Sequence, residues 1–345
     1  MKKNNLLIWA SDLDSNTGEG VLARSFINEI VKLYNCKKIK IKTFEQEILI
    51  NKMDVKNIKL KKVNNSSLFH RYLGPIYGAI YLLVFSRKYK TVYLNYLPLW
   101  NFVVFFILSR QTILGPVTGG VYKNSANNLN LVIRKYLFPI FYKISTIIIL
   151  KKFKKIIFST SLLKPYRKNN FFLYDFVTLL FSKKTGSKKK KYDIIFYNRN
   201  HATKHTVSMK RMLIFLSAYC KICAVGDFFD CDKIVNFGWI KREKVCKLIR
   251  QSKLAFNGAE NFLSIFGIDC VNNGTPVMYD QNLKSYFKFK NTSYIPVNLS
   301  NLKKSSYAIL KLLTKKPSKQ DSTLWNRVEI KKKYIRNFLA SYIFC

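Results

Sequence analysis

Residues 253–277 decide the fold, and they read KLAFNGAENFLSIFGIDCVNNGTPV. The apolar run 254–256 predicts a buried strand, and the small residues after it allow backbone to approach a ligand. A helix is expected from about Ile265 to Asn272, and Gly274 is typical of a helix C-cap. Pro276 then turns the chain into another strand. A strand, a helix and a second strand in this order predict parallel strand pairing.

The same alternation extends along the whole chain. In the C-terminal half, further strands are expected at 194–197, 222–225 and 234–237, and a helix at 242–251. In the N-terminal half, strands are expected at 6–10, 39–43, 91–95, 112–114 and 155–159, and helices at 18–34, 99–108 and 130–150. This order predicts an α/β fold of two facing Rossmann-like doubly wound domains with a cleft between them. The expected parts are an N-terminal domain (1–182), a polar, basic linker (183–191), a C-terminal domain (192–318) and a final helix (319–345).

Two cations follow the first strand of the C-terminal half. Arg199 comes at the end of the strand, and Lys204 follows five residues later at the mouth of a helix. The carboxyl ends of parallel strands border the ligand crevice of a doubly wound sheet. Two cations beside the positive end of a helix dipole suit a diphosphate, whose charge they would stabilise as a leaving group. The alternative is that both are ordinary surface cations in a Lys-rich chain.

The helix expected at 265–272 offers a second binding feature. Its first N–H groups have no partners within the helix and suit phosphate or sugar hydroxyls. Asp269 lies inside this helix and can accept hydrogen bonds from ribose hydroxyls. The alternative is an ordinary helix–strand connection whose acids are only solvated.

Two glycine-containing loops stand out in the N-terminal half. Gly18 and Gly20 follow the first expected strand and permit close approach of an acceptor or of donor phosphates, although a tight turn explains them equally well. Thr118, Gly119 and Gly120 follow a buried strand and form a flexible wall expected to face the sugar. No histidine lies in residues 112–124, so the acceptor-side chemistry stays unassigned.

These motifs together resemble the family-4 retaining glycosyltransferases, which have the GT-B fold. The family carries an acid, seven residues, a second acid and a short step to Gly-Thr-Pro-Val, and Arg199 and Lys204 match its diphosphate-binding pair. The resemblance covers residues 190–345 well and the first domain loosely. It places the second acid at Asp269, but the first acid position falls on Asn261, one residue after Glu260, so either residue can take it.

The resemblance implies site roles and chemistry. The first acid, Glu260 or Asn261, would contact the donor sugar, and the amides of Phe262, Leu263 and Ser264 would hold its hydroxyls or phosphate. The final helix would cross back to the first domain. The reaction implied is metal-independent transfer of a sugar, with retention, from a nucleotide-diphosphate donor and without a cofactor. The acceptor would be a glycan or polyprenyl-linked molecule of a bacterial surface polysaccharide.

The charge and composition limit the possible binding partners but do not identify one. The chain has 61 Lys+Arg against 18 Asp+Glu, a formal charge of +43, which attracts nucleic acid, anionic lipid or phosphorylated substrates. No nucleic-acid-binding motif is recognised, so nucleic acid is not expected as a partner. Apolar segments with basic flanks favour a cytoplasmic protein lying on the inner face of the cytoplasmic membrane, with plain core helices as the alternative. A catalytically degenerate GT-B scaffold and, less favoured, a basic nucleic-acid-binding protein remain alternative functions.

The cysteines give no metal signature. Cys220 and Cys223 have the spacing of half a zinc site, but no second such pair completes four ligands. We therefore expect reduced thiols and no bound metal.

Overall fold

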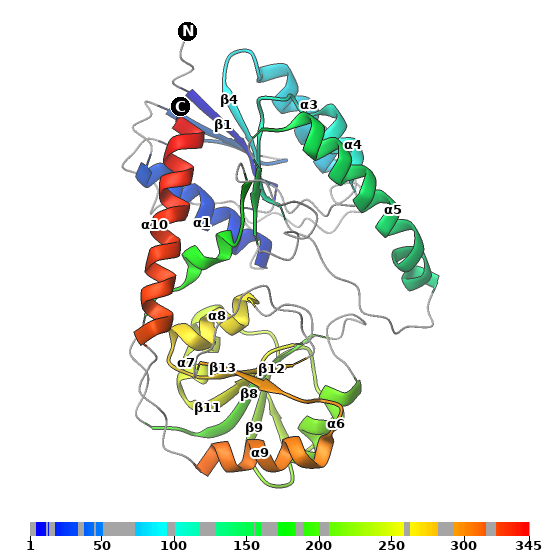
Figure 1. The fold of residues 1–345 in the computed structure, drawn as a ribbon, viewed down its shortest axis with the longest axis vertical. Coiled ribbons are helices and arrows are strands. Elements are labelled where there is room, and N and C mark those ends of the chain that lie inside the picture. The colour runs from blue at the N-terminus through cyan, green and yellow to red at the C-terminus, as the bar shows by residue number, and fades with distance from the viewer. Residues whose placement is uncertain are drawn as a thin grey trace. The chain divides into compact units, whose positions relative to one another are not determined.

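The chain forms two compact α/β units, each built on its own sheet (Figure 1). The computed structural model describes residues 5–11, 13, 18–33, 38–44, 46–50, 73–94, 101–117, 129–154, 156–159, 172–183, 189–199, 207–258, 263–281, 293–314 and 322–344. The first unit contains the described residues up to Leu179 together with those from Lys331 onward. The second unit contains the described residues from Leu180 to Ile330.

The first unit has a seven-stranded sheet of order β3-β2-β1-β4-β5-β6-β7. Its strands are β1 (Asn5–Trp9), β2 (Lys38–Lys42), β3 (Glu47–Ile50), β4 (Lys90–Tyr93), β5 (Ile113–Val117), β6 (Ile156–Phe158) and β7 (Phe172–Leu173). All neighbouring strands pair in parallel except β2 and β3, which are antiparallel. β5 is buried and apolar throughout, and β1 is so after its first residue, as expected for strands of a sheet covered on both faces.

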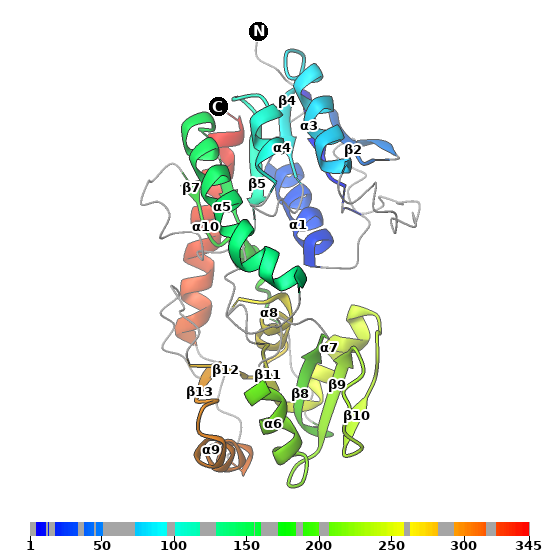
Figure 2. The same cartoon turned by 90° about the vertical axis from the view of Figure 1, so that its right-hand side faces the viewer.

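Helices cover both faces of this sheet. They are α1 (Gly18–Leu33), α3 (Gly74–Phe85), α4 (Phe102–Ile107), α5 (Leu129–Lys152) and a short 3-10 helix, η3 (Phe176–Leu180). α3, α4 and α5 form one layer on one face, which we call the three-helix layer, and α1 lies on the other face (Figure 2). Among the helices that the structure describes, none is both long enough and apolar enough to cross a membrane.

The second unit has a six-stranded sheet of order β10-β9-β8-β11-β12-β13, and all its neighbouring strands pair in parallel. The strands are β8 (Tyr192–Asn198), β9 (Ile222–Gly226), β10 (Ile234–Asn236), β11 (Ser252–Phe256), β12 (Val277–Asp280) and β13 (Tyr294–Val297). The helices are α6 (Val207–Leu216), α7 (Arg242–Arg250), α8 (Ile265–Asn272) and α9 (Leu302–Thr314). α6 packs beside α9, and α7 packs beside α8.

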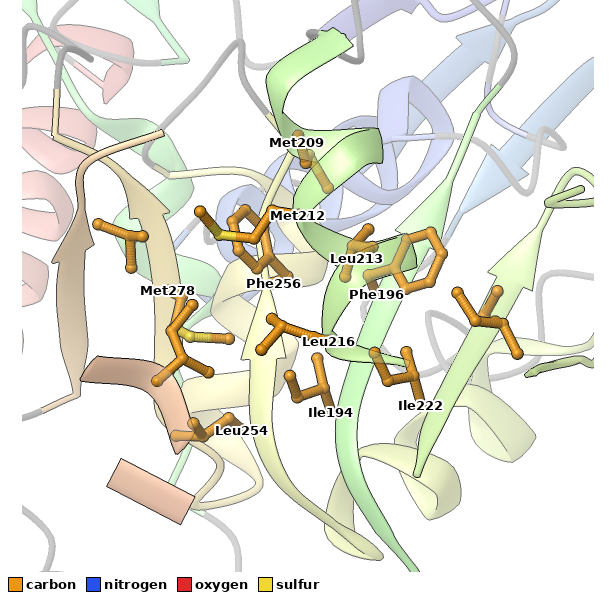
Figure 3. Packing of buried hydrophobic residues seen from close by; sticks show 14 of the residues in the cluster. Ile194, Phe196, Met209, Met212, Leu213, Leu216, Ile222, Leu254, Phe256 and Met278 are labelled. Carbon is orange, nitrogen blue, oxygen red and sulfur yellow. The ribbon is translucent and has the colours of Figure 1, made fainter. Parts of the chain in front are cut away.

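A dry core lies between α6 and the sheet of the second unit. Phe196 and Phe256, from the adjacent strands β8 and β11, point towards Met212 and Leu216 of α6 (Figure 3). All four side chains are fully buried. This packing fixes the strands whose ends carry the candidate site.

The last helix, α10 (Ser322–Phe344), begins in the second unit and ends in the first. Arg336 of α10 donates a hydrogen bond to Glu29 of α1, with 2.9 Å between Nε and Oε2. Nζ of Lys331 lies 3.8 Å from Oδ2 of Asp175. The expected crossing helix is therefore confirmed, and so is the expectation of two α/β sheets.

Tight packing at Gly78 of α3 gives a stability prediction. A Cβ built on Gly78 would lie 2.1 Å from Cε2 of Trp9, which is fully buried, whereas one on Gly74 would lie 3.5 Å from Phe44. Gly78→Ala should therefore lower the free energy of unfolding by about 1–3 kcal/mol through overpacking. Gly74→Ala, in the same helix, should cost nothing measurable. Urea denaturation followed by circular dichroism compares the two, and equal stability of both variants would contradict this packing.

The Glu29–Arg336 pair gives a pH prediction. Burial alone would raise the pKa of Glu29, but Arg336 and Lys32 outweigh it and hold that pKa below its ordinary value of 4.5. The pair's stabilisation is therefore fully present above pH 4.5 and is lost as the pH falls through the lower folded-state pKa. Glu29→Gln should be less stable than the wild type at pH 7, and the difference should shrink on acidification below pH 4.5. Stability curves that stay parallel from pH 7 to pH 3 would refute this.

Candidate functional site

The candidate site lies at the carboxyl edge of the second sheet, where the strand order reverses. β8 is followed in the chain by β9 on one side and later by β11 on the other, so the chain leaves β8 and β11 in opposite directions. This is the topological switch point at which open α/β sheets bind ligands. Arg199 directly follows β8 and is exposed. Asn257 directly follows β11, the parallel neighbour of β8.

Backbone contacts hold the strand end that carries Arg199. The Asn198 side-chain amide donates hydrogen bonds to the carbonyls of Asp227 and Phe228, at 3.0 and 2.9 Å. The N–H of Asp227 donates to the Asn198 carbonyl at 2.9 Å. Gly226 has φ of 103°, and a Cβ there would lie 2.2 Å from that same carbonyl, so the close approach requires glycine. Arg199 therefore leaves the sheet from a fixed position.

Aromatic side chains join the ends of β8 and β10 to the start of α8. Tyr197 stacks on Phe266, with ring centroids 6.0 Å apart and planes 28° apart. Trp239 meets Tyr197 edge to face at 6.0 Å, and its Nε1 donates to Oδ1 of Asp227 at 2.8 Å. Trp239 is 67% exposed. Since Tyr197 precedes Arg199 by two residues and Phe266 lies in the first turn of α8, the start of α8 and Arg199 border the same edge.

α8 begins at a side-chain N-cap that is tied to the neighbouring strand. The Ser264 hydroxyl accepts a hydrogen bond from the N–H of Gly267 at 2.9 Å and donates to Oδ1 of Asn257 at 2.5 Å. Asn257 is buried directly after β11. The N-terminal N–H groups of α8, which lack intrahelical partners, are therefore anchored at the carboxyl edge of the sheet.

Asp269 is held by an arginine that the sequence did not indicate. Arg242, the first residue of α7, donates from Nε to Oδ2 of Asp269 at 2.8 Å and from Nη2 to Oδ1 at 2.6 Å. The hydrogen bond to Asp269 raises the pKa of Arg242. The Asp269 side chain keeps 9% of its surface exposed. A carboxylate has about four acceptor positions, so this two-pronged contact leaves about two for another donor.

The structure describes only some of the residues expected at the site. Arg199, Leu263, Ser264 and Asp269 belong to the carboxyl edge described above, with Leu263 buried. Gly18 and Gly20 lie in the first turn of α1, after β1, in the first unit. The residues outside the described part of the chain are Lys204, Glu260, Asn261, Phe262, Thr118, Gly119 and Gly120. The sequence analysis gave no site role to Tyr197, Trp239, Phe266 or Arg242. A Trp directly after Gly238 was the signal in the sequence that could have pointed to Trp239.

Cys220 and Cys223, which have the spacing of half a zinc site, lie away from this edge. Cys220 precedes β9 and Cys223 lies inside it. Burial raises the pKa of Cys220 to about 11 and that of Cys223 to about 12. Both thiols are therefore protonated at neutral pH, which makes them poor nucleophiles. Within the described ranges, no three His, Cys, Asp or Glu side chains gather as a metal site would require.

No protein-family model matches the chain, and no curated protein sequence matches it. Several solved structures are similar to it. Anabaena Alr3699/HepE, in complex with UDP and glucose, is 10% identical with a TM-score of 0.61, over 97% of this chain and 99% of that one. The lipopolysaccharide outer core galactosyltransferase WaaB, in its apo form, is 8% identical with a TM-score of 0.56, over 98% and 99%.

A third similar structure belongs to a longer protein. The S. aureus TarM structure with UDP and a glycerol-linked GlcNAc is 13% identical with a TM-score of 0.48, over 76% of this chain. The chain spans 55% of the TarM length. Together with the two sheets and the crossing helix, the likeness to the HepE and WaaB structures confirms that this chain has a GT-B-like fold.

A double-mutant cycle measures the Arg242–Asp269 contact. Arg242→Met, Asp269→Asn and the double variant should give a coupling of about 1–2 kcal/mol in unfolding free energy, because Asp269 is nearly buried. The matched control is the Lys253–Asp193 pair, which is 2.8 Å apart and whose acid is more exposed, at 23% against 9% for Asp269. Its coupling should stay below about 1 kcal/mol. Equal couplings for the two pairs would show that the Arg242 contact is an ordinary surface ion pair.

Proposed function

We propose that this chain is a glycosyltransferase whose second unit binds a nucleoside-diphosphate sugar at the carboxyl edge of its sheet. The observation that carries the proposal is the placement of Arg199 and the start of α8 on the two strands that flank the switch point. A cation and a helix amino end at one edge suit a diphosphate, because both favour negative charge.

The proposed chemistry depends on charge that develops during the reaction. As the bond between sugar and phosphate breaks, negative charge builds on the diphosphate oxygen. Arg199, the N–H groups of α8 and, by its place in the motif, Lys204 stabilise that charge. Asn198 and Ser264 hold the end of β8 and the start of α8 in place, so these two parts of the site stabilise the leaving group with little reorganisation. In this proposal they supply the positive charge without a metal ion, and no cofactor takes part.

The remaining parts of the donor fit neighbouring groups. Asp269 keeps acceptor positions for the ribose hydroxyls while Arg242 fixes its orientation. The exposed indole of Trp239, beside Tyr197, offers an apolar surface for the base. Glu260 or Asn261 would contact the sugar, and Gly18, Gly20 and residues 118–120 would close over the donor sugar.

The proposed enzyme family and acceptor rest on the motifs at 199–204 and 260–277 and on the kinds of enzyme that have this fold. We propose a family-4-like enzyme that transfers with retention to a glycan or polyprenyl-linked acceptor in bacterial surface polysaccharide synthesis. The WaaB structure is that of a lipopolysaccharide galactosyltransferase, and the HepE structure holds UDP and glucose, which supports this direction. We place such an enzyme at the cytoplasmic face of the membrane.

A catalytically degenerate scaffold is the second candidate. It is favoured by the single-residue displacement of Glu260 from the first acid position of the motif. A scaffold would bind nucleotide diphosphates without turning over any donor, so binding and turnover must be measured separately.

Arg199→Ala tests the proposal. Calorimetric titration of the wild type with UDP, GDP, ADP and CDP should identify one preferred nucleotide, and the matching nucleotide sugars should be hydrolysed or transferred. In Arg199→Ala, turnover should fall about 10²–10³-fold while the fold stays intact, because one stabilising donor is lost. The matched control is Lys221→Ala, which removes one positive charge at the opposite, amino-terminal end of β9. Unchanged turnover in Arg199→Ala, or an equal loss in Lys221→Ala, would remove the diphosphate assignment.

A further inference from the structure

The three-helix layer of the first unit exposes an unusual amount of apolar side chain. Its helices lie side by side, α3 against α4 and α4 against α5, as Figure 2 shows face on. Each helix buries one side in the core beneath: Leu82 of α3, Phe105 of α4 and Ile149 of α5 belong to that cluster. The opposite sides face solvent.

The solvent-facing sides carry apolar stripes with helical spacing. Ile80 and Val84 of α3 are four residues apart and 48% and 67% exposed. Phe106 of α4 is 72% exposed. Ile140, Ile144 and Ile147 of α5 follow i, i+4, i+7 spacing and are all exposed.

Single exposed apolar residues need no explanation, but adjoining stripes on three adjacent helices do. Residues 74–85 and 102–107, which form α3 and α4, contain no charged residue. A helix that is apolar all round is normally buried on all sides. Here the core covers only one side of each helix, so we expect the opposite side to contact a second apolar environment.

The charges around this layer are mainly positive, and an acid that contacts it, Glu47 of β3, accepts a hydrogen bond from Tyr81 of α3 and is paired with Lys40. From Val55 to Tyr174 the sequence contains no Asp or Glu. Basic residues follow the ends of the helices: Arg87 and Lys88 after α3, Arg110 after α4 and Lys151 at the end of α5. Each helix directly precedes a strand of the parallel run β4, β5, β6, so all three helices run the same way and their basic ends gather at one edge.

Lys152 shows how closely these ends approach one another. Its Nζ lies 5.7 Å from the ring centre of Phe106 and donates a hydrogen bond to the Phe106 carbonyl. Burial and the nearby Arg110 lower the pKa of Lys152. One basic residue at each helix end would suffice to offset the helix dipole. The chain places several there, and residues 55–174 contain no acid.

We propose that the three-helix layer is a docking surface for an anionic lipid bilayer. Its apolar stripes would enter the boundary between headgroups and acyl chains, and its basic edge would contact lipid phosphates. A second copy of the chain would bring two mainly positive surfaces together, which is repulsive. A nucleic acid would satisfy the charges but leave the apolar stripes exposed to water. A bilayer satisfies both.

The inference goes beyond sugar transfer and is tested separately from it, since vesicle binding requires no donor. The experiment uses the full chain and sedimentation with vesicles of equal parts phosphatidylglycerol and phosphatidylcholine, compared with phosphatidylcholine alone. The wild type should bind the anionic vesicles at least about tenfold more tightly, and salt should weaken the binding, because several basic residues would contact lipid phosphates.

Two triple variants and two matched controls locate the surface. The apolar variant is Val84→Ser/Phe106→Ser/Ile144→Ser, and its control is Ile214→Ser/Val235→Ser/Ile330→Ser, at exposed apolar positions of the second unit. The basic variant is Arg87→Gln/Lys88→Gln/Arg110→Gln, and its control is Lys303→Gln/Lys304→Gln/Lys311→Gln on α9. Both variants in the three-helix layer should lose about tenfold or more of vesicle binding, since apolar burial and charge each contribute. Both controls should stay within about twofold of the wild type.

Three outcomes would overturn the proposal. An equal loss in the α9 control would show that net charge, and not this surface, drives binding. Unchanged binding of the apolar variant would show that the stripes do not enter the bilayer. A concentration-dependent dimer that dissociates in the apolar variant, with no vesicle binding by the wild type, would identify a second copy as the occupant.

Discussion

The reversal of strand order between β8 and β11 places the groups of the candidate site. Because the helices that follow these two strands, α6 and α8, lie on opposite faces of the sheet (Figure 1), the carboxyl ends of β8 and β11 form the kind of edge at which open α/β sheets bind ligands. Asn198 and Gly226 fix one side of that edge through the backbone. Asn257 and Ser264 fix the other side through one short hydrogen bond. The positive end of α8 is therefore held against the sheet before any ligand arrives.

Gly274 and Thr275, which belong to the motif that supports the resemblance, have roles in the fold that require no ligand. Gly274 has φ of 74°, which the end of α8 requires and which glycine adopts without strain. The Thr275 hydroxyl is buried and donates to the carbonyl of Ile249 at 2.8 Å, tying the turn to the end of α7. These residues position α8 and β12 whether or not a ligand binds. The pair Arg242–Asp269 adds a second tie between α7 and α8, so the segment that carries Asp269 is fixed at both ends.

How far the sequence predicts the structure depends on the range of the interaction concerned. The predicted helix at 265–272 matches α8 because its signals are local: a Ser N-cap at one end and Gly274 just beyond the other. The Arg242–Asp269 pair was not predicted, since 27 residues separate the partners and only the packing of α7 on α8 joins them. The strands β3, β7 and β13 were missed because they lie at or next to sheet edges, where short runs lack the long apolar pattern of a central strand. The sequence of α3, which carries no charged residue, does not show which side of the helix the core leaves exposed.

The distribution of acidic residues separates two explanations of the high net charge. An AT-rich genome would replace acids by Lys and Asn along the whole chain, and such drift has no reason to favour one region. All 18 Asp and Glu residues nevertheless lie outside 55–174. In the second unit, acids such as Asp269 and Asp193 each hold a cation at short distance. Residues 55–174, which include the three-helix layer, contain no acid, and Glu47 beside α3 is already paired with Lys40. The Lys and Arg residues at the helix ends therefore keep their charge for an external anion. Compositional drift accounts for the abundance of Lys, but the absence of acids from this one region calls for a local cause, and an anionic surface in contact with it is such a cause.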